Sequence, residues 1–173
     1  LVHGLDPGSE AGVTLRSLQL ITTKPVIYVF NIDEENLVNT QKQQELAKLV
    51  SPAQALFVNA QLEAELKDMN DEEALEMLES YGQTESGLTQ IIHAAYTTLG
   101  LQSYLTAGDK EVRAWTIKRG STAPQAAGVI HGDFERGFIA AEVVGYPDLI
   151  QAGSLTAARG SGKVRTEGKT YVM

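Results

Sequence analysis

An unbroken run of apolar residues followed by polar ones is the most informative pattern in this chain. Residues 26–30 are all apolar or aromatic, and residues 31–34 are mostly polar. A short apolar run rich in β-branched residues is typical of a strand that is buried on both faces of a parallel sheet. Ligands of such sheets bind just beyond the carboxyl ends of the strands. The pattern therefore predicts a buried strand whose polar tip lies at a ligand-binding edge.

A second short apolar run, residues 55–58, ends in Asn59 and Ala60 in the same way. Residues 35–50, which lie between the two runs, predict a helix that ends at Pro52. Two strands joined by a helix form a βαβ unit, which is most simply parallel and right-handed. We therefore expect the two polar tips to lie side by side on one edge of the sheet.

Helical patterns follow over residues 62–81 and 88–99. The first pattern is strongly acidic, and we interpret its carboxylates as a solvated face because charge runs on helices usually have that role. His93 and His131 are interpreted as structural residues. No metal ligand and no catalytic residue is predicted. Residues 1–14 predict an irregular lead-in.

The pattern changes after residue 100. Residues 104–106 and 112–117 predict two strands joined by a turn, and in the second segment Val112, Ala114 and Thr116 alternate with Arg113, Trp115 and Ile117 in the period of a strand. Thr122, followed by a proline at the second position, predicts the start of a helix. A third strand is expected over residues 138–144, and a closing hairpin is expected over residues 164–173. This order predicts an α+β fold of the β-grasp type, with one last edge strand missing.

Composition narrows the class of protein. The chain has no cysteine, which excludes disulfides and thiolate metal sites. No apolar run approaches the roughly 20 residues of a membrane helix, so we expect no membrane partner. Residues 1–100 carry five Lys and Arg against fifteen Asp and Glu, whereas residues 101–173 carry nine against seven. This asymmetry predicts two modules with different partners.

Asn31 and Glu34 have side chains suited to reading a purine base. An Asn amide offers both a donor and an acceptor, whereas a carboxylate only accepts hydrogen bonds. A backbone N–H near Ala60, on the second tip, would complete such a site. The alternative interpretation is a strand-end turn, in which Asn31 forms the turn and Asp33 caps the next helix.

Cationic residues in the second half suggest contact with RNA. Cations contact phosphates, and an aromatic ring stacks on bases. The alternative interpretation is a scatter of surface cations around a partly buried Trp. The candidate residues are Arg113, Trp115, Lys118, Arg119 and Arg136.

Two parts of the sequence resemble the YchF (Obg-like ATPase) family. Residues 22–34 resemble the segment that carries the altered base-specificity motif of this family. Residues 103–117 and 123–144 resemble its C-terminal TGS domain even more specifically. The resemblance covers roughly residues 15–173.

The resemblance implies a particular domain organisation. Residues 15–86 would be the C-terminal part of a nucleotide-binding P-loop domain, with parallel strands and helices. Residues 87–100 would form a connecting helix, and residues 101–173 would be a β-grasp TGS domain whose last strand is missing.

The resemblance also implies roles at the base site. Related GTPases use the motif N-K-x-D, whose Asp accepts hydrogen bonds from guanine. Here Ile32 occupies the Lys position and Glu34 is one methylene longer, which fits the preference of the family for ATP over GTP. Asn31 would bond the base edge and Ile32 would contact the ring, while Glu34 either contacts the base or anchors the loop. A second base-contacting loop would consist of Val58, Asn59, Ala60 and Gln61.

The P-loop motif G-x-x-x-x-G-K-[ST] is absent from this chain. In the family, the phosphate and Mg²⁺ sites lie N-terminal to this segment. The resemblance therefore implies that ATP or GTP is the ligand, that Mg²⁺ is held only through the N-terminal half of the same protein, and that the isolated chain does not hydrolyse ATP. It also implies a cytoplasmic protein that acts with the ribosome or RNA. The alternative is a stand-alone RNA- or protein-interaction module with a vestigial nucleotide pocket.

Overall fold

The computed structural model describes residues 8–108 and 111–173. The chain divides into two units, Leu1–Thr98 and Leu99–Met173, each of which has its own strands and helices. The first seven residues of the predicted lead-in lie outside the described residues.

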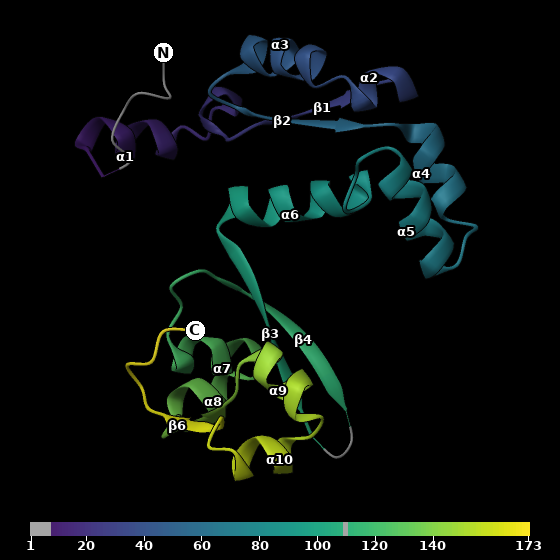
Figure 1. Cartoon of the computed structure of the whole chain (residues 1–173). Helices are drawn as coiled ribbons and strands as arrows, with labels where there is room; N and C mark the ends of the chain where they lie inside the picture. Colours follow the sequence, from purple (N-terminus) through teal and green to yellow (C-terminus); the bar gives the residue numbers. More distant parts are fainter. Residues whose placement is uncertain (1–7, 109–110) are drawn as a thin grey trace. The chain divides into compact units, whose positions relative to one another are not determined.

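Two parallel strands form the sheet of the first unit. Strand β1 (Ile27–Asn31) pairs with β2 (Gln54–Val58) in a register that sets Ile27 opposite Gln54 and Asn31 opposite Val58. The rings of Phe30 and Phe57, which are directly paired, stack with their centroids 5.4 Å apart. The predicted parallel βαβ unit is therefore confirmed. Figure 1 shows α3 (Thr40–Val50) on one side of the strand pair and α6 (Gly87–Leu99) on the other.

The prediction that the first strand is buried on both faces is wrong for the described residues. Tyr28 and Val29, whose side chains point to opposite faces of the sheet, are 44% and 45% exposed. Leu56 of β2, in contrast, is 9% exposed. In the described sheet β1 has only β2 as a neighbour, so the other edge of β1 is open, and α3 contacts β2.

Asparagines break both of the long helices that the sequence predicts in this unit. The side chain of Asn39 accepts a hydrogen bond from the Lys42 N–H, and the side chain of Asn70 accepts one from the Glu73 N–H. Each Asn therefore caps a new helix, so single helices over residues 35–50 and 62–81 are wrong predictions. The observed helices are α2 (Glu34–Val38), α3, α4 (Ala60–Leu66) and α5 (Asp71–Ser80).

Helix α1 (Glu10–Ser17) begins within the segment that was predicted to be irregular. The hydroxyl of Ser9 accepts a hydrogen bond from the Gly12 N–H, which satisfies a free donor of the first turn. The prediction of an irregular lead-in is therefore wrong from Glu10 onward. A short 3₁₀ helix (Ile21–Thr23) precedes β1.

The first residue of α6 makes two close contacts. The Glu63 carboxylate accepts hydrogen bonds from the N–H groups of Gly87 and Leu88, at 2.6 and 3.2 Å. A Cβ atom added to Gly87 would lie 2.6 Å from Cγ1 of Val58. The helix therefore begins directly against the tip of β2, and it does so only because position 87 has no side chain.

The second unit opens with the predicted hairpin. Strand β3 (Leu101–Ala107) pairs antiparallel with β4 (Val112–Lys118), and α7 (Ala123–Ile130) contacts one face. The Tyr104 hydroxyl donates a hydrogen bond to the Ala126 carbonyl across this interface. Thr122 and Gln125 form a capping box at the start of α7, so the predicted helix start is confirmed.

The remainder of this unit differs from the prediction. Strand β5 covers Ala141–Val143 alone and is therefore shorter than the predicted strand over residues 138–144. Helix α8 (Gly132–Arg136) precedes it, and the Nδ1 atom of His131 caps that helix. The predicted closing hairpin is wrong, since β6 (Arg165–Glu167) pairs with β5 instead.

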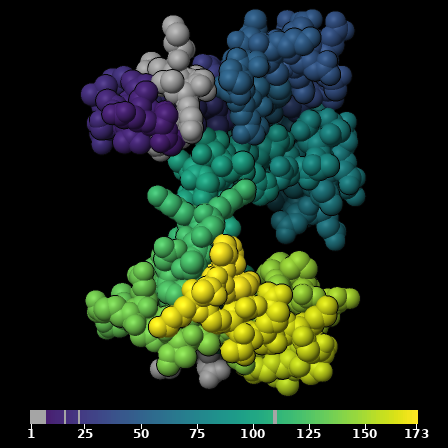
Figure 2. Space-filling view, turned by 90° about the vertical axis from the view of Figure 1, so that its left-hand side faces the viewer, coloured from purple at the N-terminus to yellow at the C-terminus, as the bar shows by residue number. Residues whose placement is uncertain are grey.

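Two further helices, α9 (Tyr146–Ala152) and α10 (Leu155–Gly160), connect β5 to β6. The C-terminal segment, yellow in Figure 2, lies on the surface of the second unit. It is anchored by a bridge between Val172 and Thr122. Across the described parts of the chain, no helix is both long and apolar enough to span a bilayer.

Candidate functional site

The two polar tips meet at the carboxyl end of the strand pair. The Ala60 N–H donates a hydrogen bond to Oδ1 of Asn31 over 3.0 Å, and the Ile32 N–H donates to the Val58 carbonyl over 2.9 Å. Parallel strands end at the same edge, so both loops are held side by side there. The predicted juxtaposition of the two tips is confirmed.

One donor at this edge remains open to a ligand. Asn31 is exposed, and within the described residues its Nδ2 amide has no hydrogen-bond partner. The Ala60 N–H, which the sequence assigned to the base, is satisfied by Asn31 in this structure. Ile32 is half-buried beside them. The edge therefore offers one amide donor and part of one apolar side chain.

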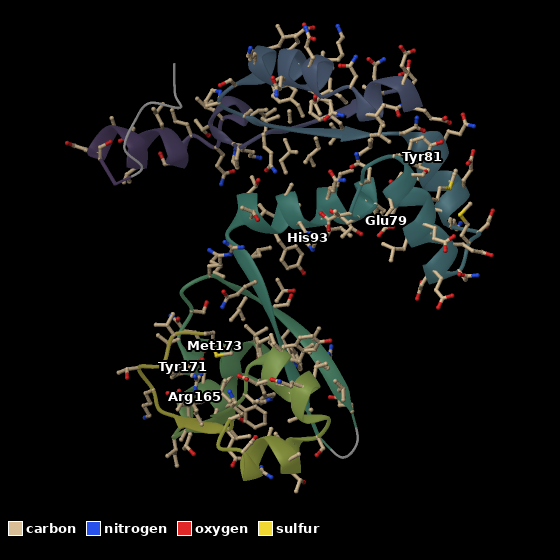
Figure 3. The ribbon with its side chains drawn as sticks, viewed as in Figure 1. Glu79, Tyr81, His93, Arg165, Tyr171 and Met173 are labelled. Carbon is tan, nitrogen blue, oxygen red and sulfur yellow. The ribbon has the colours of Figure 1, made fainter. Side chains whose placement is uncertain are left out.

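The two carboxylates of the motif have different partners. Oδ1 of Asp33 accepts a hydrogen bond from the Asn36 N–H over 2.9 Å, so Asp33 caps α2. Oε2 of Glu34 accepts a hydrogen bond from the hydroxyl of Tyr81 over 3.0 Å. Figure 3 shows Tyr81 at the same end of the strand pair. Glu34 thus bonds a residue of its own unit, and its predicted contact with a base stays a prediction.

Sequence reasoning did not identify Tyr81. It is 47 positions from Glu34 and directly follows α5, so no periodic pattern links the two residues. The hydrogen bond to Glu34 raises the pKa of Tyr81 above its ordinary value, and partial burial and the charges of Glu34 and Glu65 add to the shift.

Asn59 has a structural role that limits its use as a base contact. Its side chain is 7% exposed, and its Oδ1 accepts a hydrogen bond from the Leu62 N–H over 2.9 Å. This bond caps α4. Val58, beside it, packs against Gly87. Of the polar side chains of the second loop, Asn59 is therefore used as a cap, and the exposed Gln61 donates a hydrogen bond to Glu65 over 3.1 Å.

An open cleft of about 420 Å³ lies elsewhere in this unit, between β2 and α6. Its lining includes His93, whose Nδ1 atom lies 3.1 Å from Oε2 of Glu85. None of the residues predicted to read a base lines this cleft. Among the residues that the structure describes, no group of three or more His, Asp or Glu is arranged to hold a metal ion.

Two of the RNA candidates lie together on β4. The guanidinium of Arg113 lies 4.4 Å from the centroid of the Trp115 ring. The indole N–H of Trp115 donates to the hydroxyl of Thr106 over 2.9 Å, which fixes the ring on the hairpin. Arg113 and Trp115 share one face of the strand because side chains alternate along it.

The other three candidates have separate positions. Lys118 is five residues from Arg113 and therefore lies on the opposite face of β4. Arg119 donates from its side chain to the Leu101 carbonyl, and Arg136 forms an ion pair with Asp133 on α8. The five predicted residues thus do not form one continuous surface.

The fold defines a class of protein: a mixed α/β chain in which a parallel βαβ unit precedes a separate α+β unit.

Residues 101–173 match the YchF-GTPase_C family, described as a protein of unknown function (DUF933). The Ribosome-binding ATPase YchF of Bacillus subtilis (strain 168) is 45% identical over 164 residues, which cover 92% of this chain and 45% of that protein.

Two further comparisons match proteins of the same family. Obg-like ATPase 1 of Schizosaccharomyces pombe is 42% identical over 166 residues, which cover 92% of this chain and 42% of that protein. The solved structure of the Schizosaccharomyces pombe YchF GTPase matches with a TM-score of 0.79 at 38% identity, covering 99% of this chain and 47% of that one. The chain therefore matches members of the YchF (Obg-like ATPase) family over nearly all of its own length, and it spans about half the length of the curated relatives it matches.

The predicted family resemblance and the mixed α/β class are thereby confirmed. The assignment of the two units to a P-loop-type domain and a TGS domain remains a prediction.

Proposed function

We propose that the chain is the C-terminal portion of a YchF-like nucleotide-binding ATPase and supplies the edge that reads the purine base. The observation that carries this proposal is the hydrogen bond between Ala60 and Asn31, which joins the two strand tips and leaves the Asn31 amide donor open. A rigidly held amide beside an apolar side chain suits the edge and face of a purine ring.

Adenine is the base that this edge fits best. Adenine and guanine both present N7 as an acceptor for an amide donor such as Nδ2 of Asn31. Guanine also needs an acceptor for its N1–H and N2 amine, and the carboxylate that would provide it, Glu34, is bonded to Tyr81. We therefore propose that the site prefers ATP to GTP.

The phosphates and Mg²⁺ are assigned to another part of the protein. The relatives are about twice as long as this chain, and the chain has no P-loop motif. We propose that an N-terminal half holds the phosphates and Mg²⁺ against this edge. Phosphoryl transfer would then need both halves.

The second unit is proposed to be a TGS-type module that contacts the ribosome through RNA, in the cytoplasm. Several relatives carry the name Ribosome-binding ATPase. Arg113 stacked on Trp115 provides a charge and an aromatic face at one place, which is the combination that single-stranded RNA needs.

A nucleotide titration tests the base proposal. If the chain reads only the base, AMP and ATP should bind with the same affinity, because the sequence has no P-loop motif to hold phosphates. Chemical shifts of the Asn31 side-chain amide and the Ala60 backbone amide should follow both titrations in NMR spectra. The absence of any saturable shift, even with an N-terminal half of a relative added in trans, would favour the alternative of an interaction module with a vestigial pocket.

An RNA titration tests the second unit. Arg113→Ala should weaken binding of a single-stranded RNA and lower the slope of log affinity against log salt by about 0.7, since one phosphate contact is lost. Lys118→Ala, on the opposite face of β4, serves as the matched control and should leave both quantities unchanged. Equal effects of the two substitutions in fluorescence anisotropy would contradict a site at Arg113 and Trp115.

A further inference from the structure

Tyr81 is held firmly at the position from which it bonds Glu34. Its N–H donates to the Leu78 carbonyl over 3.1 Å, and the next residue, Gly82, has a φ of 68° and donates to the Glu79 carbonyl. The chain reverses here in a left-handed conformation that glycine adopts readily. The hydroxyl of Tyr81 therefore reaches Glu34 from a fixed turn at the end of α5.

Within the proposed base site, the Glu34 carboxylate is the group of the first tip whose chemistry suits guanine and adenine differently. An ionised carboxylate only accepts hydrogen bonds. Guanine presents donors at N1 and N2, whereas adenine presents an acceptor at N1, so a free carboxylate at that edge would attract guanine and repel adenine. The position of the Glu34 carboxylate is thus a potential determinant of base preference.

We propose that Tyr81 is a positioning residue that restrains the Glu34 carboxylate away from a purine bound at Asn31, and that it thereby favours adenine over guanine. The proposal rests on the base-reading function proposed above. The restraint comes from one hydrogen bond of 3.0 Å between α2 and the turn after α5. Without it, the Glu34 side chain is free to turn toward the base.

Tyr81→Phe removes the hydroxyl and keeps the ring. A single hydrogen bond of this kind corresponds to about a fivefold change in an equilibrium constant. We expect the ratio of AMP to GMP affinity to fall about fivefold in Tyr81→Phe, mainly because GMP binds more tightly. Adding Glu34→Gln to Tyr81→Phe should abolish the gain for GMP, since no carboxylate is then present.

Tyr28→Phe is the matched control. Tyr28 is an exposed tyrosine of the same unit, and within the described residues its hydroxyl has no hydrogen-bond partner. It should leave the ratio unchanged. The amide spectrum of each variant reports whether the fold is kept.

A second measurement needs no nucleotide. In Glu34→Gln the pKa of Tyr81 should fall toward its ordinary value, because the charged acceptor is removed. An unchanged Tyr81 titration in this variant would overturn the proposal, because it would show that the hydrogen bond does not form in solution.

The nucleotide results separate the two proposals. Binding of AMP with an unchanged AMP to GMP ratio in Tyr81→Phe would overturn the role of Tyr81 alone. If neither nucleotide shifts Asn31 or Ala60 in any variant, base recognition itself fails, and the selectivity role of Tyr81 fails with it.

Discussion

Asn31→Ala should strongly weaken nucleotide binding by this chain and destabilise the pair of strand tips. The substitution removes the open Nδ2 donor and also removes the acceptor of the Ala60 N–H. Both residues are exposed, so water can bond the freed Ala60 N–H, and we expect a loss of stability of about 0.5–1.5 kcal/mol, the net contribution of one hydrogen bond. We expect the affinity for AMP to fall at least about tenfold in NMR titration.

Asn31→Asp separates the two effects. A carboxylate at this position can still accept the hydrogen bond of the Ala60 N–H, but it has no donor for a base. This variant should therefore keep the stability of the first unit and lose AMP binding. Wild-type affinity in Asn31→Asp would show that the Asn31 donor does not read the base, and a stable Asn31→Ala would show that the bond between the tips contributes little to folding.

Gly87→Ala is expected to have the largest effect on stability. Its new Cβ would lie 2.6 Å from Cγ1 of Val58 and 3.0 Å from Oε1 of Glu63. Val58 is β-branched and lies at the end of β2, so it has little freedom to move aside. We expect the free energy of unfolding of the first unit to fall by about 1–3 kcal/mol, measured by hydrogen exchange of the β2 amides.

Gly128→Ala provides the contrast. A Cβ at this position of α7 would also make a close contact, but chiefly with the carboxylate of Glu135, while Cβ of Glu135 would lie 3.1 Å away. The end of a Glu side chain rotates away easily, and alanine is a better helix former than glycine by about 1 kcal/mol. Gly128→Ala should therefore be neutral or stabilising for the second unit. A loss as large as that of Gly87→Ala would contradict this account of both positions.

The strands and helix starts that the sequence predicted correctly depend on residues that lie close together in the chain. The apolar runs before Asn31 and Asn59 located both strands and their common edge, although the first run was wrongly expected to be buried on both faces. The helix start at Thr122 was predicted for a similar reason, since capping depends on residues within one turn. The break at Asn70 was predictable too, because Glu73 three positions later completes a capping box.

The features that the sequence did not predict depend on contacts between residues far apart in the chain. Nothing local to Glu34 indicates that Tyr81 will bond it, and nothing local to Asn31 indicates that it will take the Ala60 N–H. The pairing of β6 with β5 instead of with residues 171–173 is also a tertiary choice. Strand alternation, known from the sequence, would have placed Arg113 and Lys118 on opposite faces once both were assigned to one strand.

The open edge of β1 also affects how copies of the chain behave toward one another. Only β2 pairs with β1 in the described part of the sheet, so the other edge has unpaired backbone N–H and C=O groups beside an uncharged, partly exposed run. Such edges template aggregation between molecules. The excess of carboxylates in residues 1–100, fifteen against five basic residues, keeps copies apart by repulsion. We therefore expect the acidity of the first unit to oppose self-association of the isolated chain.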